Sequence, residues 1–431
     1  MTTAVKPVTV RNRILALDVL RGFALFGILL MNIQFFAMPE AAYSIPAVFG
    51  DLTGINLGVW WFSYLFADQK FMTIFSMLFG AGIVLMTSKA DRQGGHSLRL
   101  HYRRMFWLLI IGLVHGYLLW SGDVLVLYAI CGFVIYWFRR WSPKWLLLLG
   151  VIVFAIGPLI SFAGGASVQY APPEVRAELV ADFWPSQVVL DTEIEAYRSG
   201  WLGQMAARVP TAVELQTTAL FFWGLWRAGG LMLMGMGFFK WGIFSGERRN
   251  RFYLVLIAMG LLIGLPVVAW GGYQNFAHGW DPIYARLGMG YQFNYWASLF
   301  VSLGYVGMIV LWLRTDWLAW LQHGLGSVGR MALTNYLLQT IIATFIFYGH
   351  GFGLFATVSR TEQMLVVLGI WALELVFSPL WLRHFRFGPV EWLWRTLTYW
   401  KLQPMRVAPV GSKDLVYSRS RAKPPCDSSR E

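Results

Sequence analysis

Long runs of apolar residues, separated by short polar segments, follow one another along most of the chain. A helix needs about 20 consecutive apolar residues to cross the hydrocarbon core of a bilayer. The pattern therefore predicts an all-α polytopic integral membrane protein with about ten transmembrane helices. Their approximate limits are 14–36, 62–88, 105–121, 123–138, 145–164, 217–244, 252–271, 291–313, 330–350 and 362–382.

The basic residues predict the orientation of these helices. Loops on the cytoplasmic side of a membrane are enriched in lysine and arginine. Alternate connections hold 26 of the 35 lysines and arginines, in residues 1–13, 89–104, 139–144, 240–251, 314–328 and 383–431. An even number of helices with both termini in the cytoplasm accounts for this distribution.

The same pattern divides the chain into regions. Residues 1–13 form a cytoplasmic segment, and 14–382 form a transmembrane helical domain. Within that domain an acidic extracytoplasmic loop at about 165–212 is expected to fold as a small amphipathic cap. Residues 383–406 form a cytoplasmic juxtamembrane segment, and 407–431, rich in Pro, Ser, Lys and Arg, predict a disordered basic tail.

Composition supports lipid as the natural solvent. Hydrophobic residues make up 57% of the 431 residues and charged residues only 13%, too few to cover a soluble surface. The net charge of +13 follows from topology, and no soluble basic face predicts nucleic acid as a partner. Two cysteines and seven scattered histidines predict neither a disulfide framework nor a metal site. A homodimer stays open.

Ionisable groups within apolar spans need a reason, because each costs several kcal/mol unless it is paired or faces water. Asp18 and Arg21 stand three residues apart in the first span, and Asn32 returns to the face of Arg21 after eleven residues. These groups either form a functional polar stripe or hold helices together by hydrogen bonds. Arg227 and Glu374 are either a buried ion pair or the lining of one cavity.

A second polar cluster is predicted around a tight turn between two spans. His115 lies near the outer end of the third span, and Asp123 and Tyr128 follow it across the turn. A carboxylate can orient an imidazole and make it a general base for an acceptor hydroxyl or amine. The alternative is a structural histidine with its hydrogen bonds satisfied.

The predicted ninth span opens with two polar pairs four residues apart, Arg330 with Thr334 and Asn335 with Gln339. Arg330 lies at a cytoplasmic helix start and suits a phosphate, as do two arginines before the third span, Arg103 and Arg104. The alternative for each arginine is anchoring at the positively charged face of the membrane.

Several of these segments together resemble one family. They are Leu17–Ala24, Met31–Ile33, Gly112–Gly116, Gly122–Leu125, Tyr128, Gly329–Tyr336 and Gly388–Arg395. The set is similar to that of the YeiB-like family of bacterial inner-membrane proteins, long catalogued as a domain of unknown function. The match extends over about residues 11–406.

That family is grouped, more distantly, with transmembrane acyltransferases such as heparan-α-glucosaminide N-acetyltransferase. The resemblance implies an enzyme in the bacterial inner (plasma) membrane that takes an acyl group from a cytoplasmic acyl-CoA donor, such as acetyl-CoA. Asp18, Arg21 and Asn32 match the shared motif of the first helix. The lysosomal enzyme has its catalytic histidine just after that asparagine, whereas residues 34–43 here contain none.

We therefore expect a membrane acyltransferase acting on a sugar or another small hydroxyl or amine acceptor. Arg330, Arg103 and Arg104 would hold donor phosphates, Asn32 and Asn335 would orient the thioester carbonyl, and His115 with Asp123 would deprotonate the acceptor. The remaining candidate donor- or substrate-binding residues are Asp18, Arg21, Tyr128, Thr334 and Gln339. The alternatives are a small-molecule transporter or permease and a membrane scaffold.

Overall fold

The protein is helical throughout the part that the computed structural model describes, residues 15–407. Within it the only β-type pairing is an isolated bridge between Phe385 and Arg406. Seven helical stretches are long and apolar enough to cross a membrane, which confirms the prediction of an all-α membrane protein. They are Leu15–Ala37, Gly54–Arg92, Pro143–Val168, Met205–Lys240, Asn250–Ala277, Ile283–Trp312 and Arg360–His384. The predicted N-terminal segment and nearly all of the predicted basic tail lie outside the described residues.

The first third of the chain contains a break within a long apolar stretch. Gln69 has a left-handed backbone conformation, with φ of 66°, and it separates two helices that the hydrophobic pattern merges. The elements are α1 (Leu15–Ala37), α2 (Glu40–Ser44), α3 (Gly54–Phe66), α4 (Lys70–Arg92), α5 (Ser97–Leu118), α6 (Leu125–Ile135), a 3₁₀ turn (Tyr136–Phe138) and α7 (Pro143–Val168). Helix α5 is not among the seven stretches because its first turns are rich in arginine and histidine.

The middle of the chain is helical with three short π-helical segments, η3, η4 and η5. Its elements are α8 (Pro173–Phe183), α9 (Gln187–Arg198), α10 (Met205–Gln216), η3 (Leu220–Gly224), α11 (Leu225–Lys240), α12 (Asn250–Met259), η4 (Gly260–Gly264), α13 (Leu265–Ala277), η5 (Ile283–Leu287) and α14 (Met289–Trp312). The last elements are α15 (Ala319–Arg330), α16 (Ala332–Phe347), α17 (Arg360–His384) and α18 (Pro389–Tyr399).

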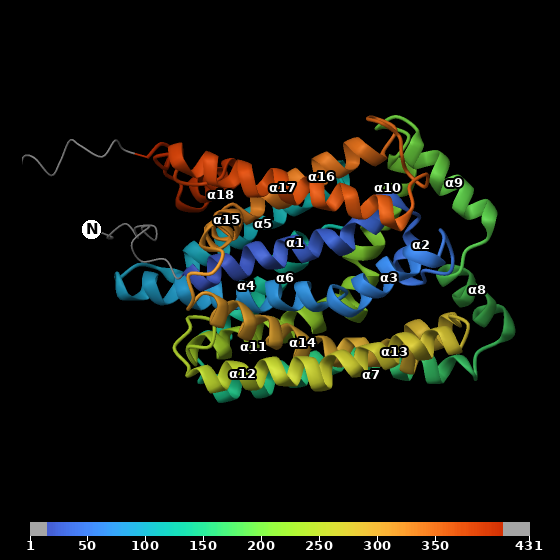
Figure 1. Cartoon of the computed structure of the whole chain (residues 1–431), viewed down its shortest axis with the longest axis horizontal. Coiled ribbons are helices and arrows are strands. Elements are labelled where there is room, and N and C mark those ends of the chain that lie inside the picture. The colour runs from blue at the N-terminus through green and yellow to red at the C-terminus, as the bar shows by residue number, and fades with distance from the viewer. Residues whose placement is uncertain (1–14, 408–431) are drawn as a thin grey trace, which may run out of the picture.

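The long helices run side by side along the long axis of the molecule (Figure 1). Helices α1 and α4 lie in the middle, where α1 packs on α4, α15, α16 and α17, and α4 also packs on α11. Helices α15 and α18 lie at one end of the bundle, and α8 and α9 lie at the opposite end (Figure 1). The segment predicted as a cap is thus helical and distant from α18.

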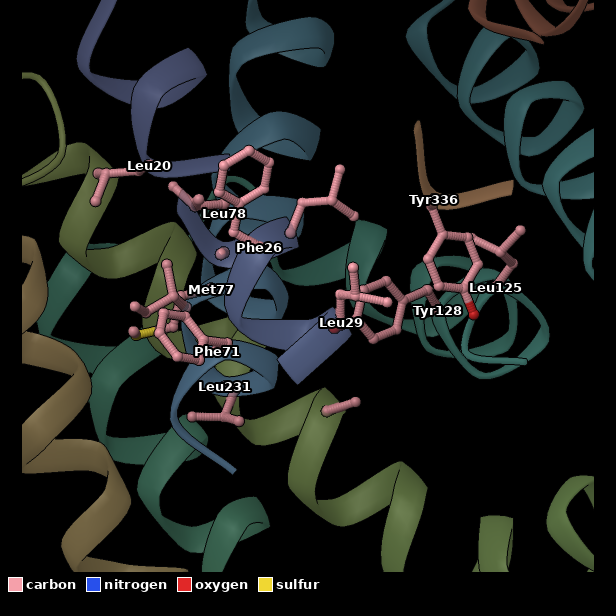
Figure 2. Close-up of a cluster of buried hydrophobic side chains, with 14 of the residues drawn as sticks. Leu20, Phe26, Leu29, Phe71, Met77, Leu78, Leu125, Tyr128, Leu231 and Tyr336 are labelled. Atoms are coloured by element: carbon pink, nitrogen blue, oxygen red, sulfur yellow. The ribbon is translucent and has the colours of Figure 1, made fainter. Parts of the chain in front are cut away.

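One continuous apolar core joins these helices. Leu20 and Leu29 of α1, Met77 of α4 and Leu231 of α11 are buried in it, and Figure 2 shows them with aromatic neighbours from α4 and α6. The helices on the outside, such as α7 and α17, bury only 28% and 22% of the residues in their apolar stretches, as expected for helices with a surface that faces lipid.

A contact between α1 and α15 positions the polar residues of both helices. A Cβ atom on Gly22 would lie 2.1 Å from the carbonyl oxygen of Leu325, and one on Gly329 would lie 1.8 Å from that of Asp18. Only glycine permits such a close approach of two backbones. The approach places Asp18 and Arg21 beside Arg330, so two segments about 300 residues apart in sequence meet at one end of the bundle.

A candidate anion-binding cavity

A cavity of about 290 Å³ lies where α1, α4, α5, α6, α15, α16 and α18 converge. Its wall includes four arginines, each from a different helix: Arg21, Arg104, Arg330 and Arg395. Two acidic residues also line it, Asp18 and Glu391. The formal charge of the wall is therefore positive, which suits an anionic ligand.

The two carboxylates of the wall already have partners in the protein. Asp18 Oδ1 accepts a hydrogen bond from Arg21 at 2.9 Å. Glu391 Oε1 accepts from the backbone amides of Leu333, at 2.7 Å, and Thr334, at 3.0 Å, and the Thr334 hydroxyl donates to Oε2. Burial raises the pKa of Glu391, and these hydrogen bonds oppose the rise.

Glu391 therefore caps the N-terminus of α16, where backbone amides have no partner within the helix. It fastens α18 to α16 across the cavity. The Val390 amide adds a hydrogen bond to the Thr334 hydroxyl, at 3.1 Å. Gly388, the residue before α18, lies so close that a Cβ there would be 2.5 Å from the same hydroxyl.

Aromatic rings of the same region hold two of the arginines. The Arg104 guanidinium lies 4.4 Å from the ring centre of Trp394 in α18, and the Trp394 indole donates to the Arg104 carbonyl at 2.9 Å. The Arg395 guanidinium lies 4.5 Å from the ring centre of Phe387. These stacking contacts hold the two guanidinium groups at the cavity wall.

The remaining wall of the cavity is apolar and aromatic. Leu25, Phe75, Leu125, Tyr128 and Tyr336 belong to it, and Figure 2 shows Leu125, Tyr128 and Tyr336 close together at the edge of the core. The hydroxyls of Tyr128 and Ser76 are 2.8 Å apart. The cavity thus combines a group of cations with a surface that suits an uncharged chain.

His115 lies behind this wall. Its Nδ1 is 2.8 Å from Asp123 Oδ1, so the predicted contact between the two residues is present, and its Nε2 is 3.0 Å from the Thr340 hydroxyl. The imidazole is 1% exposed and is not part of the cavity wall. Tyr336, which does line the cavity, packs on it with ring centres 5.1 Å apart. Asp123 also accepts from the Val126 amide at 2.8 Å and so caps α6.

Two of the candidate residues, Arg103 and Asn32, do not line this cavity. Arg103 does not line the cavity, because it points from α5 to Trp400, at 5.0 Å from the ring centre. Asn32 is half-buried. It lies beyond Ile28, the last residue of α1 that lines the cavity. Three other candidate binding residues, Asp18, Arg21 and Tyr128, line the cavity.

The polar pairs of the predicted ninth span also separate. The chain leaves helical geometry at Met331, with φ of −111° and ψ of 28°, so that α15 ends at Arg330 and α16 starts at Ala332. The four-residue spacing therefore does not place Thr334 on the face of Arg330. The remaining two residues of the pairs face α17: the Asn335 amide donates to the Ser378 hydroxyl at 2.9 Å, and the Gln339 amide to Glu374 at 3.1 Å.

Arg227 and Glu374 do not pair with each other, and neither lines the cavity described above. Arg227 donates to the hydroxyls of Thr73, at 2.9 Å, and Ser298, at 3.1 Å, and so joins α11 to α4 and α14. Both side chains are fully buried. We interpret them as polar contacts between helices.

Sequence reasoning missed Glu391, Trp394 and Arg395 as residues of the cavity. Glu391 and Arg395 are four residues apart on α18, a spacing that places two side chains on one helix face. They belong to the segment Gly388–Arg395, which contributes to the family resemblance but for which the sequence predicted no role. The amphipathic pattern of this segment was the available signal.

Comparison with known proteins gives relatives over nearly the whole chain. A model of a protein family of unknown function, DUF418, matches residues 238–401. The uncharacterized protein YeiB of Escherichia coli K12 is 34% identical over 399 residues, which cover 90% of this chain and 96% of that protein. The uncharacterized protein YxaH of Bacillus subtilis 168 is 30% identical over 422 residues, which cover 94% of this chain and 98% of that protein.

Proposed function

Because the chain belongs to the YeiB-like family of proteins of unknown function, we propose an activity from the cavity itself: a membrane-embedded acyltransferase that uses an acyl-CoA-type donor. The acceptor is a sugar or another small hydroxyl or amine compound at or across the bacterial inner membrane. The proposal includes ten transmembrane helices with both termini in the cytoplasm. The distribution of lysine and arginine supports this orientation, because these residues are enriched in cytoplasmic loops. In this orientation α18 and the cavity lie on the cytoplasmic side.

The observation that carries the proposal is the convergence of four arginines on a cavity whose wall, apart from its charged residues, is mostly apolar and aromatic. Coenzyme A has the same division, since its phosphates are strongly anionic and its pantetheine arm and acyl group carry no charge. Arginine binds phosphate through several parallel hydrogen bonds. The arginines would hold the phosphates, while Tyr128, Tyr336 and their apolar neighbours would surround the arm.

The chemical step needs a base and a proton donor. The acceptor oxygen or nitrogen would attack the thioester carbonyl carbon, a bond to the acyl group would form, and the carbon–sulfur bond would break. His115, oriented by Asp123, would take the acceptor's proton at Nε2 and return it to the thiolate of coenzyme A. Because Tyr336 lies between His115 and the cavity, this step requires that the tyrosine side chain move.

Calorimetric binding of acetyl-CoA to the purified protein tests the donor site, and α5 supplies a matched pair of variants. Arg104→Ala removes a cavity arginine, and Arg103→Ala removes its neighbour outside the cavity. Loss of charge-assisted hydrogen bonds predicts affinity about ten- to hundredfold lower for Arg104→Ala. Binding that is equally weakened in both variants, or absent in the unaltered protein at millimolar acetyl-CoA, would refute the donor site.

A small-molecule transporter is the second candidate, and the break in the membrane stretch Gly54–Arg92 favours it. At the break Gln69 is left-handed and Lys70 is fully buried. Broken helices with buried polar groups are a frequent feature of transporter binding sites. Substrate flux into proteoliposomes without a covalent product would favour transport, whereas an acylated product without flux would favour acyl transfer.

A further inference from the structure

A second, smaller cavity lies at the end of the bundle opposite α18. Its volume is about 70 Å³. Its wall comes from the ends of α1, α2 and α13, from α3 and the α3–α4 break, and from η5 and the start of α14. It shares no lining residue with the cavity lined by the four arginines, called the cationic cavity below. At about 10–15 Å³ per water molecule on this scale, the cavity has room for roughly five to seven waters, or a ligand of similar size.

The charged groups around this small cavity are largely satisfied within the protein. Asn294 links two of them: its amide donates to Asp68 Oδ2 at 2.6 Å, and its carbonyl accepts from Lys70 Nζ at 2.7 Å. Lys70 also donates to the Tyr64 carbonyl at 2.7 Å. The Arg286 guanidinium stacks on Phe183, 5.7 Å from the ring centre. The cavity therefore offers no strong net charge to a ligand.

Several other hydrogen-bonding atoms, in contrast, converge on it without partners. Among the described residues, five that line this cavity have a buried side-chain atom without a hydrogen bond. Two of these atoms are acceptors, Gln69 Oε1 and Asn275 Oδ1, and two are donors, Trp280 Nε1 and Arg286 Nε. The fifth is the Tyr291 hydroxyl, which can donate and accept. Asn275 is 4% exposed and Trp280 is 6% exposed. Buried polar atoms are normally paired, so five in one small space indicate a ligand with both donors and acceptors.

The backbone fixes two of these groups. Trp280 has a left-handed conformation, with φ of 58°, and its amide donates to the Asn275 carbonyl at 2.9 Å. Its indole packs edge-on against Trp60, at 5.5 Å between ring centres, and Trp60 stacks on Tyr64 at 4.9 Å. Rigid aromatic faces beside unpaired amides are suited to C–H groups that alternate with hydroxyls.

We propose that this cavity binds a small neutral polyol: glycerol, a glycerol-like head group or one edge of a sugar ring. Each hydroxyl of a polyol both donates and accepts, which matches a cavity wall that holds unpaired acceptors, unpaired donors and the unpaired hydroxyl of Tyr291. An organic cation fits poorly, because Asp68 is already bonded to Asn294 and the Arg286 charge is close by. The proposal goes beyond acyl transfer and does not depend on it.

Saturation-transfer NMR with the full chain in lipid nanodiscs, free of glycerol and sugar detergents, tests the site. Glycerol is the probe, and tetramethylammonium is the cationic comparison. Trp280→Phe keeps an aromatic ring at this position and removes the indole N–H, so we expect glycerol binding about three- to tenfold weaker. Trp270→Phe is the matched control on α13, because Trp270 is 53% exposed and outside the cavity.

The outcomes separate the two proposals. Arg104→Ala, which alters only the cationic cavity, should leave glycerol binding unchanged whether or not the chain binds acetyl-CoA. Asn275→Leu provides a second variant, expected to weaken binding similarly. Glycerol binding that is equal in the Trp280→Phe and Trp270→Phe proteins would overturn the assignment, as would saturable binding of tetramethylammonium in place of glycerol.

Discussion

The close approach of α1 and α15 predicts a large effect from one added methyl group. In Gly329→Ala the new Cβ would lie 1.8 Å from the Asp18 carbonyl oxygen and 2.8 Å from the Gly22 amide nitrogen. Both atoms belong to backbone, so no side chain can rotate away. An ordinary contact begins at 3.4 Å, and the two helices must therefore separate by more than an ångström.

Two opposing effects determine how Gly329→Ala changes the free energy of unfolding. Overpacking costs about 1–3 kcal/mol and sometimes more, and a backbone clash belongs at the upper end. Alanine in place of glycine within a helix returns up to about 1 kcal/mol. We expect Gly329→Ala to lower the free energy of unfolding by about 2 kcal/mol, the difference between these terms. It should also weaken anion binding, because Arg330 moves relative to Asp18 and Arg21.

Helix α15 contains its own control. A Cβ on Gly326 would meet only the side chains of Leu15 and Val19, at 3.4 and 3.5 Å. Gly326→Ala should therefore be neutral or slightly stabilising. Thermal unfolding in one detergent, with calorimetric binding of acetyl-CoA, compares the two variants. A Gly329→Ala protein as stable as Gly326→Ala would refute the close helix crossing on which the cavity is built.

Three further predictions concern other parts of the bundle. Glu391→Ala should destabilise the protein by about 2–3 kcal/mol, because it leaves the α16 amides unpaired, and thermal unfolding against a neighbouring Trp400→Ala variant measures this. Burial, followed by repulsion from Glu214 and Glu193, raises the pKa of Glu40 to about 7. Between about pH 4.5 and 7 the folded state therefore keeps a proton on Glu40 that the unfolded state releases. The free energy of unfolding falls across this range, and the stabilisation is lost as pH rises through 7. Glu40→Gln should flatten the dependence, and equal pH profiles would contradict it. Thr340→Val should lower acyl transfer with little change in acetyl-CoA affinity, since Thr340 contacts His115 and lies outside the cavity wall.

Much of the helical architecture could be predicted because it depends on local patterns. Apolar runs long enough for a bilayer give the membrane helices, whatever their neighbours are. The contact between His115 and Asp123 was also predictable, because a short turn constrains two residues that are eight positions apart. Asp18 and Arg21 pair within a single helix for the same reason.

Predictions from residue spacing along a helix were wrong where the helix is interrupted. The left-handed Gln69 divides one apolar stretch into α3 and α4, and Met331 interrupts the predicted ninth span. A break of one residue rotates every later side chain, so Thr334 and Asn335 face α18 and α17 and not the cavity. Neither position carries a proline or glycine that would have indicated the break.

The sequence by itself determined that this chain is helical, that it belongs in a membrane and which short-range polar pairs form. The tertiary structure decided which arginines act together, because Arg21, Arg104, Arg330 and Arg395 lie on four helices and meet only where α1 crosses α15 and α18 closes over them. Hydrophobic periodicity fixes the buried face of each helix. The partner of that face, and the depth at which two helices cross, depend on contacts between residues hundreds of positions apart.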